Sequence, residues 1–173
     1  MDRKIYISNE TLALAEYIPE IDAPNDYECW QDKAMQDGYN FKMSMTREAF
    51  CGRPIRARFI AAILRRSDRA VIGSISLSPE GSPPDLAIML YEPFRHQGYG
   101  PLAFSLGVKY CFDELKLDRL YAGCYETNTA SLSMLRRCGF QPHPEGNQQE
   151  KHYLTGEPIT QLDFVILNPA SEQ

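Results

Sequence analysis

The sequence LAIMLYEPFRHQGYGP, residues 86–101, decides the fold. It begins with an apolar run, Leu86–Leu90, that predicts a buried strand. It ends at Pro101, which suits the first turn of a helix because its missing N–H would be unpaired there anyway. The segment therefore predicts a strand, a glycine-containing turn and a helix in direct succession.

The turn itself, RHQGYG at residues 95–100, has the features of an anion-binding site. Its two glycines let consecutive backbone N–H groups converge on an anion without a side chain in the way. The start of the following helix adds unpaired N–H groups and about half a positive charge. Arg95 carries a further positive charge. We therefore expect this turn to bind a diphosphate.

Two other interpretations fit the same glycines. Gly98-x-Gly100-x-x-Ala103 also matches the looser dinucleotide-binding fingerprint, which should be followed by an acidic residue at the end of the next strand. Asp118 has a suitable spacing but precedes the next predicted strand, and the chain lacks the repeated βαβ units of such folds. The remaining interpretation is a helix start that simply requires glycine.

Upstream of this segment the pattern changes from strand to irregular helix and back. Residues 4–8 indicate a short strand. The stretch 11–50 is polar and mixed, and we expect it to be helical in pieces. Residues 58–64 and 71–78 indicate a hairpin, and the second of these runs alternates apolar residues with serine.

Downstream, helical and strand patterns alternate. Phe104, Val108, Cys111 and Leu115 recur at the spacing of one helical face. The later predicted elements are a strand at 119–124, a helix at 128–137 stopped by Gly139, a strand from Phe140, a loop at 146–150 and a strand at 161–167. This order predicts one α/β (α+β) domain over residues 1–173.

The overall charge argues against one class of partner. The chain has 43% hydrophobic and 24% charged residues, as is usual for a globular protein, and a net charge of -5. Nucleic-acid binding needs a basic patch, so we expect no nucleic-acid partner. A negative charge is compatible with a cationic substrate such as an amine.

The cysteines and histidines suggest neither disulfides nor metal. The five cysteines are Cys29, Cys51, Cys111, Cys124 and Cys138, an odd number without a close pair. The three histidines have no metal-ligand spacing with them or with each other, so we expect no metal. No stretch is long and apolar enough to cross a membrane, and no apolar run follows Arg3 and Lys4 as in a signal peptide. The expected location is the cytoplasm, where thiols stay reduced.

A second motif lies on the helix predicted at 128–137. Asn128, Ser131, Leu135 and Cys138 have the spacing of one helical face. A polar start to a face that continues as Leu and Cys suggests hydrogen bonds to a ligand lying along the beginning of the helix. Asn128 also suits a simple N-cap, and the two roles are compatible.

Together the two motifs resemble those of the GNAT superfamily of acyl-CoA N-acyltransferases. The resemblance rests on a strand followed in order by Arg95-x-x-Gly98-x-Gly100, Asn128-x-x-Ser131 and Cys138-Gly139-Phe140. Asn-x-x-Ser and Trp30-x-Asp32 look most like the ribosomal-protein N-terminal acetyltransferase branch. The resemblance implies a central mixed, mostly antiparallel, twisted sheet of six to seven strands. About four helices would flank it, with splayed parallel strands at the cofactor site.

The resemblance also implies an acetyl-CoA site. Backbone groups of the predicted strand would hold the pantetheine arm. The glycine turn would bind the pyrophosphate, and the second helix would lie at the thioester end. The implied cofactor-binding residues are Ile88, Met89, Leu90, Arg95, His96, Gln97, Gly98, Tyr99, Gly100, Asn128 and Ser131.

Amine acetylation needs a base for the ammonium, and an acid can protonate the departing thiolate. Many family members have a tyrosine acid where this chain has Leu135, which cannot donate a proton. Ser131, one turn earlier, is the preferred substitute, although its hydroxyl also suits packing against the backbone. Tyr121 and Tyr125 are reserves. An acid is dispensable if the thiolate leaves unaided.

For the base, Asp85 matches a position where related members carry Glu. Its other interpretation is a solvated turn residue after Pro84. Glu126 and Glu92 are alternates, and Glu126 also suits a favourable charge at a helix N-terminus.

The resemblance implies direct acetyl transfer to a primary amine, on a small molecule or a protein N-terminus. Two other functions remain open on the same fold. One is a non-catalytic acyl-CoA-binding or sensor domain, which Leu135 favours, and the other is transfer of a larger acyl group. We expect a monomer or homodimer.

Overall fold

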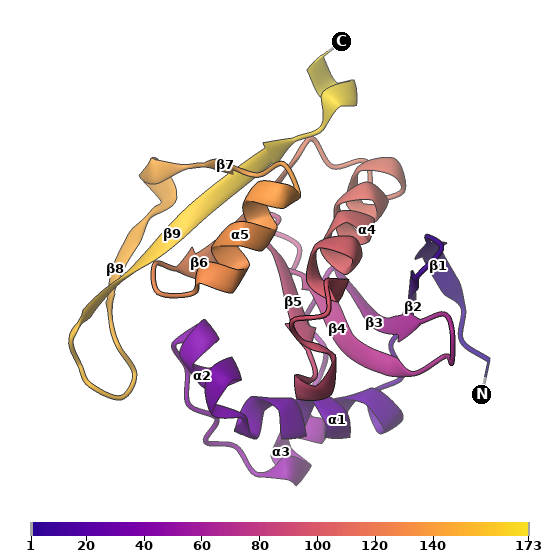
Figure 1. Cartoon of the computed structure of the whole chain (residues 1–173), viewed down its shortest axis with the longest axis horizontal. Coiled ribbons are helices and arrows are strands. Elements are labelled where there is room, and N and C mark those ends of the chain that lie inside the picture. The colour runs from indigo at the N-terminus through magenta and orange to yellow at the C-terminus, as the bar shows by residue number, and fades with distance from the viewer. Residues whose placement is uncertain (1, 173) are drawn as a thin grey trace.

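The computed structural model describes residues 2–172 and places their strands in two sheets, with helices over them (Figure 1). The first sheet has the order β1-β2-β3-β4-β5, and every neighbouring pair is antiparallel. Its strands are β1 (Ile5–Ser8), β2 (Leu12–Glu16), β3 (Phe59–Arg65), β4 (Val71–Leu77) and β5 (Leu86–Leu90). The second sheet pairs β6 (Arg119–Tyr125), β7 (Gln141–Pro142) and β8 (Gln148–Lys151) with β9 (Pro158–Leu167), all antiparallel.

The two sheets meet where β5 lies beside β6. A single parallel bridge joins Asp85 to Tyr121, and the Tyr121 N–H donates to the Pro84 carbonyl at 2.9 Å. Beyond this bridge the ladder registers of the described residues record no pairing between the two strands. The expected splayed parallel strands are therefore present, and they leave a wedge between the sheets.

Two helices cover one face of the sheets, α4 (Tyr99–Asp113) and α5 (Thr129–Arg137) (Figure 1). The predicted apolar face of α4 is confirmed for Phe104, Val108 and Cys111, which are buried in the main core. Leu115 also packs against this core but lies beyond the end of the helix at Asp113. The other three helices, α1 (Pro19–Gln31), α2 (Lys33–Tyr39) and α3 (Arg47–Cys51), lie together at the end of the sheet where α4 begins.

Two strands of the structure, β2 and β8, were not predicted from the sequence. β2 has the sequence LALAE, in which four buried residues in succession hide the alternation of a strand, and its ladder with β3 decides its conformation. β8 is QQEK, within the stretch predicted as a loop at 146–150, and it forms through backbone pairing with β9. The described residues thus contain nine strands in two sheets, where six to seven in one sheet were expected.

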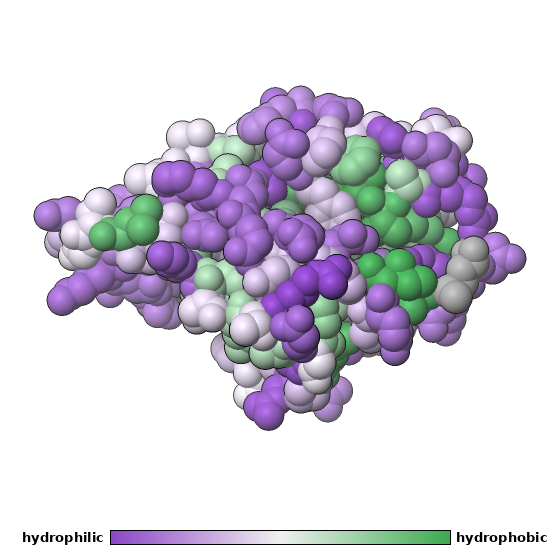
Figure 2. Space-filling view, turned by 90° about the horizontal axis from the view of Figure 1, so that it is seen from below, coloured by the Kyte–Doolittle hydropathy of each residue, from purple (hydrophilic) through white to green (hydrophobic). Residues whose placement is uncertain are grey.

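The surface shows no single large hydrophobic face from the side of α1 to α3 (Figure 2). Hydrophilic residues dominate this view, and the hydrophobic areas are separated by them. None of the helices in residues 2–172 combines the length and apolar character that a bilayer-spanning helix requires.

Gly107 tests how tightly α4 packs on the sheet. A Cβ atom there would lie 2.5 Å from Ile75 Cδ1 and 3.3 Å from Leu86 Cδ2. We expect Gly107→Val to lower the free energy of unfolding by about 1–3 kcal/mol, because overpacking forces neighbouring side chains off their rotamers. Urea denaturation measures the change. Ser105→Val on the exposed face of the same helix is the control, and an equal loss there would contradict the packing explanation.

Candidate functional site

Two adjoining cavities occupy the wedge between β5 and β6. The smaller, of about 160 Å³, extends along both strands and beneath α5. The larger, of about 530 Å³, runs from α2 past the end of β5 to the start of α4. Both are lined by Gly38, Tyr39, Ile88, Asn128, Ser131 and Met134. A ligand can therefore extend from one cavity into the other.

The glycine turn opens onto the larger cavity. His96, Gly98 and Gly100 line it, and His96 and Gly98 both have positive φ angles, of 59° and 83°. Gly98 is the N-cap of α4, and within residues 2–172 no side-chain cap hydrogen bond is recorded at the start of this helix. A Cβ atom at Gly98 would meet nothing within 4 Å. The first N–H groups of α4 are thus available to an anion, and diphosphate binding at this turn stays a prediction.

Two other residues of the turn point elsewhere. The Gln97 side-chain amide donates to the Pro93 carbonyl at 2.6 Å, and Tyr99 packs against the main core. Neither residue lines the cavity, so any contact they make with a ligand would come from the backbone.

Arg95 lines the larger cavity, but its positive charge already has a partner. Its guanidinium forms an ion pair with Asp32 and also bonds to Cys29 Sγ at 3.3 Å. Its Nε donates to the Leu90 carbonyl at 2.8 Å. Asp32 in turn caps α2 by accepting from the Ala34 N–H at 3.1 Å. Arg95 therefore ties the turn to the junction of α1 and α2, and its role as a phosphate ligand stays a prediction.

The edge of β5 that faces the wedge provides backbone groups. Ile88 and Leu90 line the larger cavity, whereas Met89 does not, because successive residues of a strand point to opposite faces. The Ile88 carbonyl accepts a hydrogen bond from the Tyr39 hydroxyl at 2.7 Å. This edge corresponds to the one expected to hold a pantetheine arm.

The second motif lies at the junction of the two cavities. Asn128 caps α5 by accepting from the Ser131 N–H at 3.1 Å, and its amide lies 3.5 Å from the Gly38 carbonyl. Leu135 is buried in the wall of the smaller cavity. Cys138 lies 3.5 Å from the Ser105 hydroxyl and lines neither cavity. Asn128 and Ser131 are thus a helix cap and part of the site at once.

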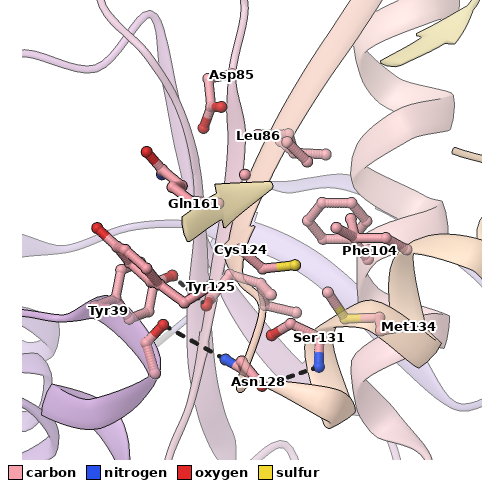
Figure 3. A pocket seen from close by; sticks show the side chains of 16 residues that line it. Tyr39, Asp85, Leu86, Phe104, Cys124, Tyr125, Asn128, Ser131, Met134 and Gln161 are labelled. Atoms are coloured by element: carbon pink, nitrogen blue, oxygen red, sulfur yellow. Dashed lines mark hydrogen bonds between the residues drawn. The ribbon is translucent and has the colours of Figure 1, made fainter. Parts of the chain in front are cut away.

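Asp85 lies at the opposite end of the smaller cavity from Asn128 and Ser131 (Figure 3). Burial, with a contribution from the Asp163 carboxylate, raises the pKa of Asp85 to about 6. The solvated-turn interpretation does not fit this partly enclosed position. A carboxyl group with such a pKa is mostly ionised at neutral pH and still basic enough to accept a proton.

The reserve candidates divide into one inside the site and three outside it. Tyr125 lines the smaller cavity and donates to Glu150 Oε2 at 2.8 Å. Burial, and then this bond, raises the pKa of Tyr125 to about 12. Tyr121, Glu126 and Glu92 line neither cavity, and Glu126 accepts from the Thr160 N–H at 2.9 Å.

Sequence reasoning missed Tyr39 and Gln161, which both line the smaller cavity (Figure 3). Tyr39 comes from the stretch 11–50, where no pattern marks it. Gln161 lies over Gly123 of β6, where a Cβ atom would be 2.8 Å from its Nε2. An isolated glycine within a strand pattern is a signal of such close approach, and it was available in the sequence.

Comparison with known proteins agrees with this arrangement. Residues 10–141 match the family model described as acetyltransferase (GNAT) domain. The probable N-acetyltransferase YjcK of Bacillus subtilis (strain 168) is 34% identical over 115 residues, which are 64% of this chain and 62% of that protein. The match thus spans less than two thirds of this relative.

Solved structures share the fold at low identity. Spermidine N-acetyltransferase from Vibrio cholerae, in complex with CoA and spermine, superposes with a TM-score of 0.78 at 14% identity, covering 95% of this chain and 100% of that one. Ribosomal-protein-S5-alanine acetyltransferase from Vibrio fischeri gives 0.76 at 16% identity, covering 94% and 96%. Since the family model covers most of the sequence, the chain belongs to the GNAT acetyltransferase family.

Proposed function

We propose that the protein is an acetyl-CoA-dependent N-acetyltransferase that transfers the acetyl group directly to a primary amine. The observation that carries the proposal is the path through the wedge. One end is the uncapped start of α4 at Gly98, and the other is the raised-pKa carboxyl of Asp85. Family membership supports the same reaction.

The residues present fit coenzyme A. The open space at Gly98 and the free N–H groups of α4 suit a diphosphate. The β5 edge at Ile88 and Leu90 suits an extended amide-containing arm, since its backbone groups can pair with amides. Asn128 and Ser131 then border the point where the larger cavity meets the smaller one, which suits the thioester end.

The proton-transfer roles follow from the smaller cavity. Asp85 accepts a proton from the acceptor ammonium, directly or through water, so that a neutral amine attacks the thioester carbonyl. Ser131 donates a proton to the departing thiolate and regains the proton that the attacking nitrogen loses as the amide forms. Its position borders both cavities, whereas Leu135 has no proton to give. Tyr125 is a weaker candidate, since its hydroxyl is bonded to Glu150.

The acceptor belongs to one of two classes that the compared proteins suggest. The V. cholerae structure contains spermine, and the V. fischeri protein is named for a ribosomal-protein alanine. Polyamines and protein N-termini are therefore the first acceptors to test. The carboxylate of Asp85, which lines the smaller cavity, favours a cationic amine.

A non-catalytic acyl-CoA-binding domain is the second candidate function. Leu135 favours it, since it places a buried apolar side chain where many relatives have a proton donor. The two functions differ in one measurement. The enzyme releases free thiol from acetyl-CoA in the presence of some amine of the panel, whereas the sensor binds acetyl-CoA and releases none.

A substitution at Gly98 tests whether acetyl-CoA binds at the glycine turn. We expect Gly98→Val to abolish acetyl-CoA binding in isothermal titration, because its side chain would enter the diphosphate space and strain a left-handed backbone. Gly81→Val is the matched control, since Gly81 also has a positive φ, of 86°, and open space around it but lies in the β4–β5 loop. Tight acetyl-CoA binding by the Gly98 variant would contradict this assignment of the site. Absence of binding by the wild type at millimolar acetyl-CoA would contradict it as well.

Asp85 tests the base. The wild-type kcat/KM should rise with pH through about 6, and Asp85→Asn should lose this rise and about 10²–10⁴-fold in rate. If the rise survives in Asp85→Asn and disappears in Glu126→Gln, the base is Glu126.

The same variant should be more stable. The pKa of Asp85 is raised from its ordinary value to about 6, so ionisation of the carboxyl costs stability as the pH rises, and the full cost is present above about 6. Asp85→Asn should therefore unfold with a free energy about 1–3 kcal/mol higher at pH 7.5, and the gain should vanish near pH 4. Parallel urea titrations at the two pH values measure it.

Ser131 tests the acid. We expect Ser131→Ala to lower kcat while the dissociation constant for coenzyme A changes little, because a proton donor acts on the leaving group. Initial rates of thiol release from acetyl-CoA, measured with saturating amine, give kcat. An unchanged kcat assigns the leaving-group proton to another donor or to none.

A further inference from the structure

Tyr39 occupies an unusual position at the C-terminal end of α2. It lines both cavities, and its hydroxyl donates to the Ile88 carbonyl at 2.7 Å (Figure 3). Ile88 lies on β5, which pairs with β4 on one side through Ile75. On the wedge side, the Tyr39 hydroxyl is the recorded partner of its carbonyl. A side chain thus occupies a backbone acceptor on the edge that the proposed function assigns to the pantetheine arm.

The ring of Tyr39 is held independently of this hydrogen bond. It packs edge-on against Trp30, with ring centroids 5.0 Å apart. The helix that carries it is fixed at its start by Asp32 and just after its end by Asn40, whose amide donates to the Lys151 carbonyl at 3.0 Å. Removing the hydroxyl alone should therefore leave the ring and the helix in place.

The hydroxyl acts as a donor and keeps its proton. Burial, with a contribution from Asp85, raises the pKa of Tyr39 above its ordinary value. A phenol with a raised pKa stays neutral at neutral pH and is a hydrogen-bond donor. The role considered for Tyr39 is donation of a hydrogen bond without transfer of the proton, which differs from that proposed for Ser131.

We propose that Tyr39 is a positioning residue whose hydroxyl exchanges partners when acyl-CoA binds. In the ligand-free chain it holds the Ile88 carbonyl. In the complex this carbonyl accepts from an amide N–H of the bound arm, and the Tyr39 hydroxyl donates to the acyl carbonyl oxygen. The proposal rests on the proposed function, because it requires the arm to lie along β5.

The exchange predicts different effects on two ligands that differ only in the acyl group. Coenzyme A has no acyl carbonyl, so Tyr39→Phe removes a competitor for Ile88 and should tighten its binding about 2- to 10-fold, the range of one hydrogen bond. Acetyl-CoA loses its donor in the same variant, so its dissociation constant should stay unchanged or rise. The ratio of the two constants, acetyl-CoA over coenzyme A, should therefore increase at least about 2-fold.

Isothermal titration of wild type and Tyr39→Phe with both ligands is the test, with thermal melting to establish folding. Tyr27→Phe is the matched control, because the Tyr27 hydroxyl also donates to a backbone carbonyl, that of Met45 at 3.2 Å, but lines neither cavity. Its ratio should equal that of the wild type.

Three results have distinct meanings. An increased ratio in Tyr39→Phe alone supports the exchange. Equal changes for both ligands, or weaker coenzyme A binding, overturn it and leave the proposed function standing. Failure of the wild type to bind either ligand overturns the proposed function itself.

Discussion

The site depends on the fact that β5 and β6 are joined at one residue pair and then separate. The Asp85–Tyr121 bridge fixes the sheets at one end of the wedge. Because α4 follows β5 and α5 follows β6, both helices begin at its open end, where Gly98 and Asn128 line the larger cavity. Separation also leaves strand edges without ladder partners, and side chains such as Tyr39 supply the missing hydrogen bonds.

The wedge creates two different electrostatic environments along one path. At the start of α4 the backbone presents donors without a side-chain cap, which favours negative charge. At the bridged end, burial disfavours the ionised form of Asp85 and makes it a better proton acceptor than an exposed aspartate. The separation of β5 from β6 thus provides both an anion-binding end at the start of α4 and a basic end at Asp85.

The sequence predicts the parts of this site that local rules determine. Leu86–Leu90 is a strand with the expected bounds, a turn at Gly98 precedes a helix, and Asn128 caps a helix, because hydrophobic runs, glycine and capping residues act over a few positions. The strand LALAE and the polar β8 depend on distant partners, and so do the Asp32–Arg95 ion pair and the Tyr39–Ile88 bond. Nothing in the neighbouring residues specifies these contacts.

Asn40 has a consequence for how the protein can change. It follows α2 in a left-handed conformation, donates to the Lys151 carbonyl, and accepts from the Tyr153 N–H at 2.8 Å. One side-chain amide therefore ties the end of α2 to a backbone segment that begins 111 residues later in the sequence. An insertion or deletion in either segment would break these hydrogen bonds unless the other segment shifted with it. In evolution or in engineering, α2 and the β8–β9 turn should thus be exchanged together, as one interchangeable module.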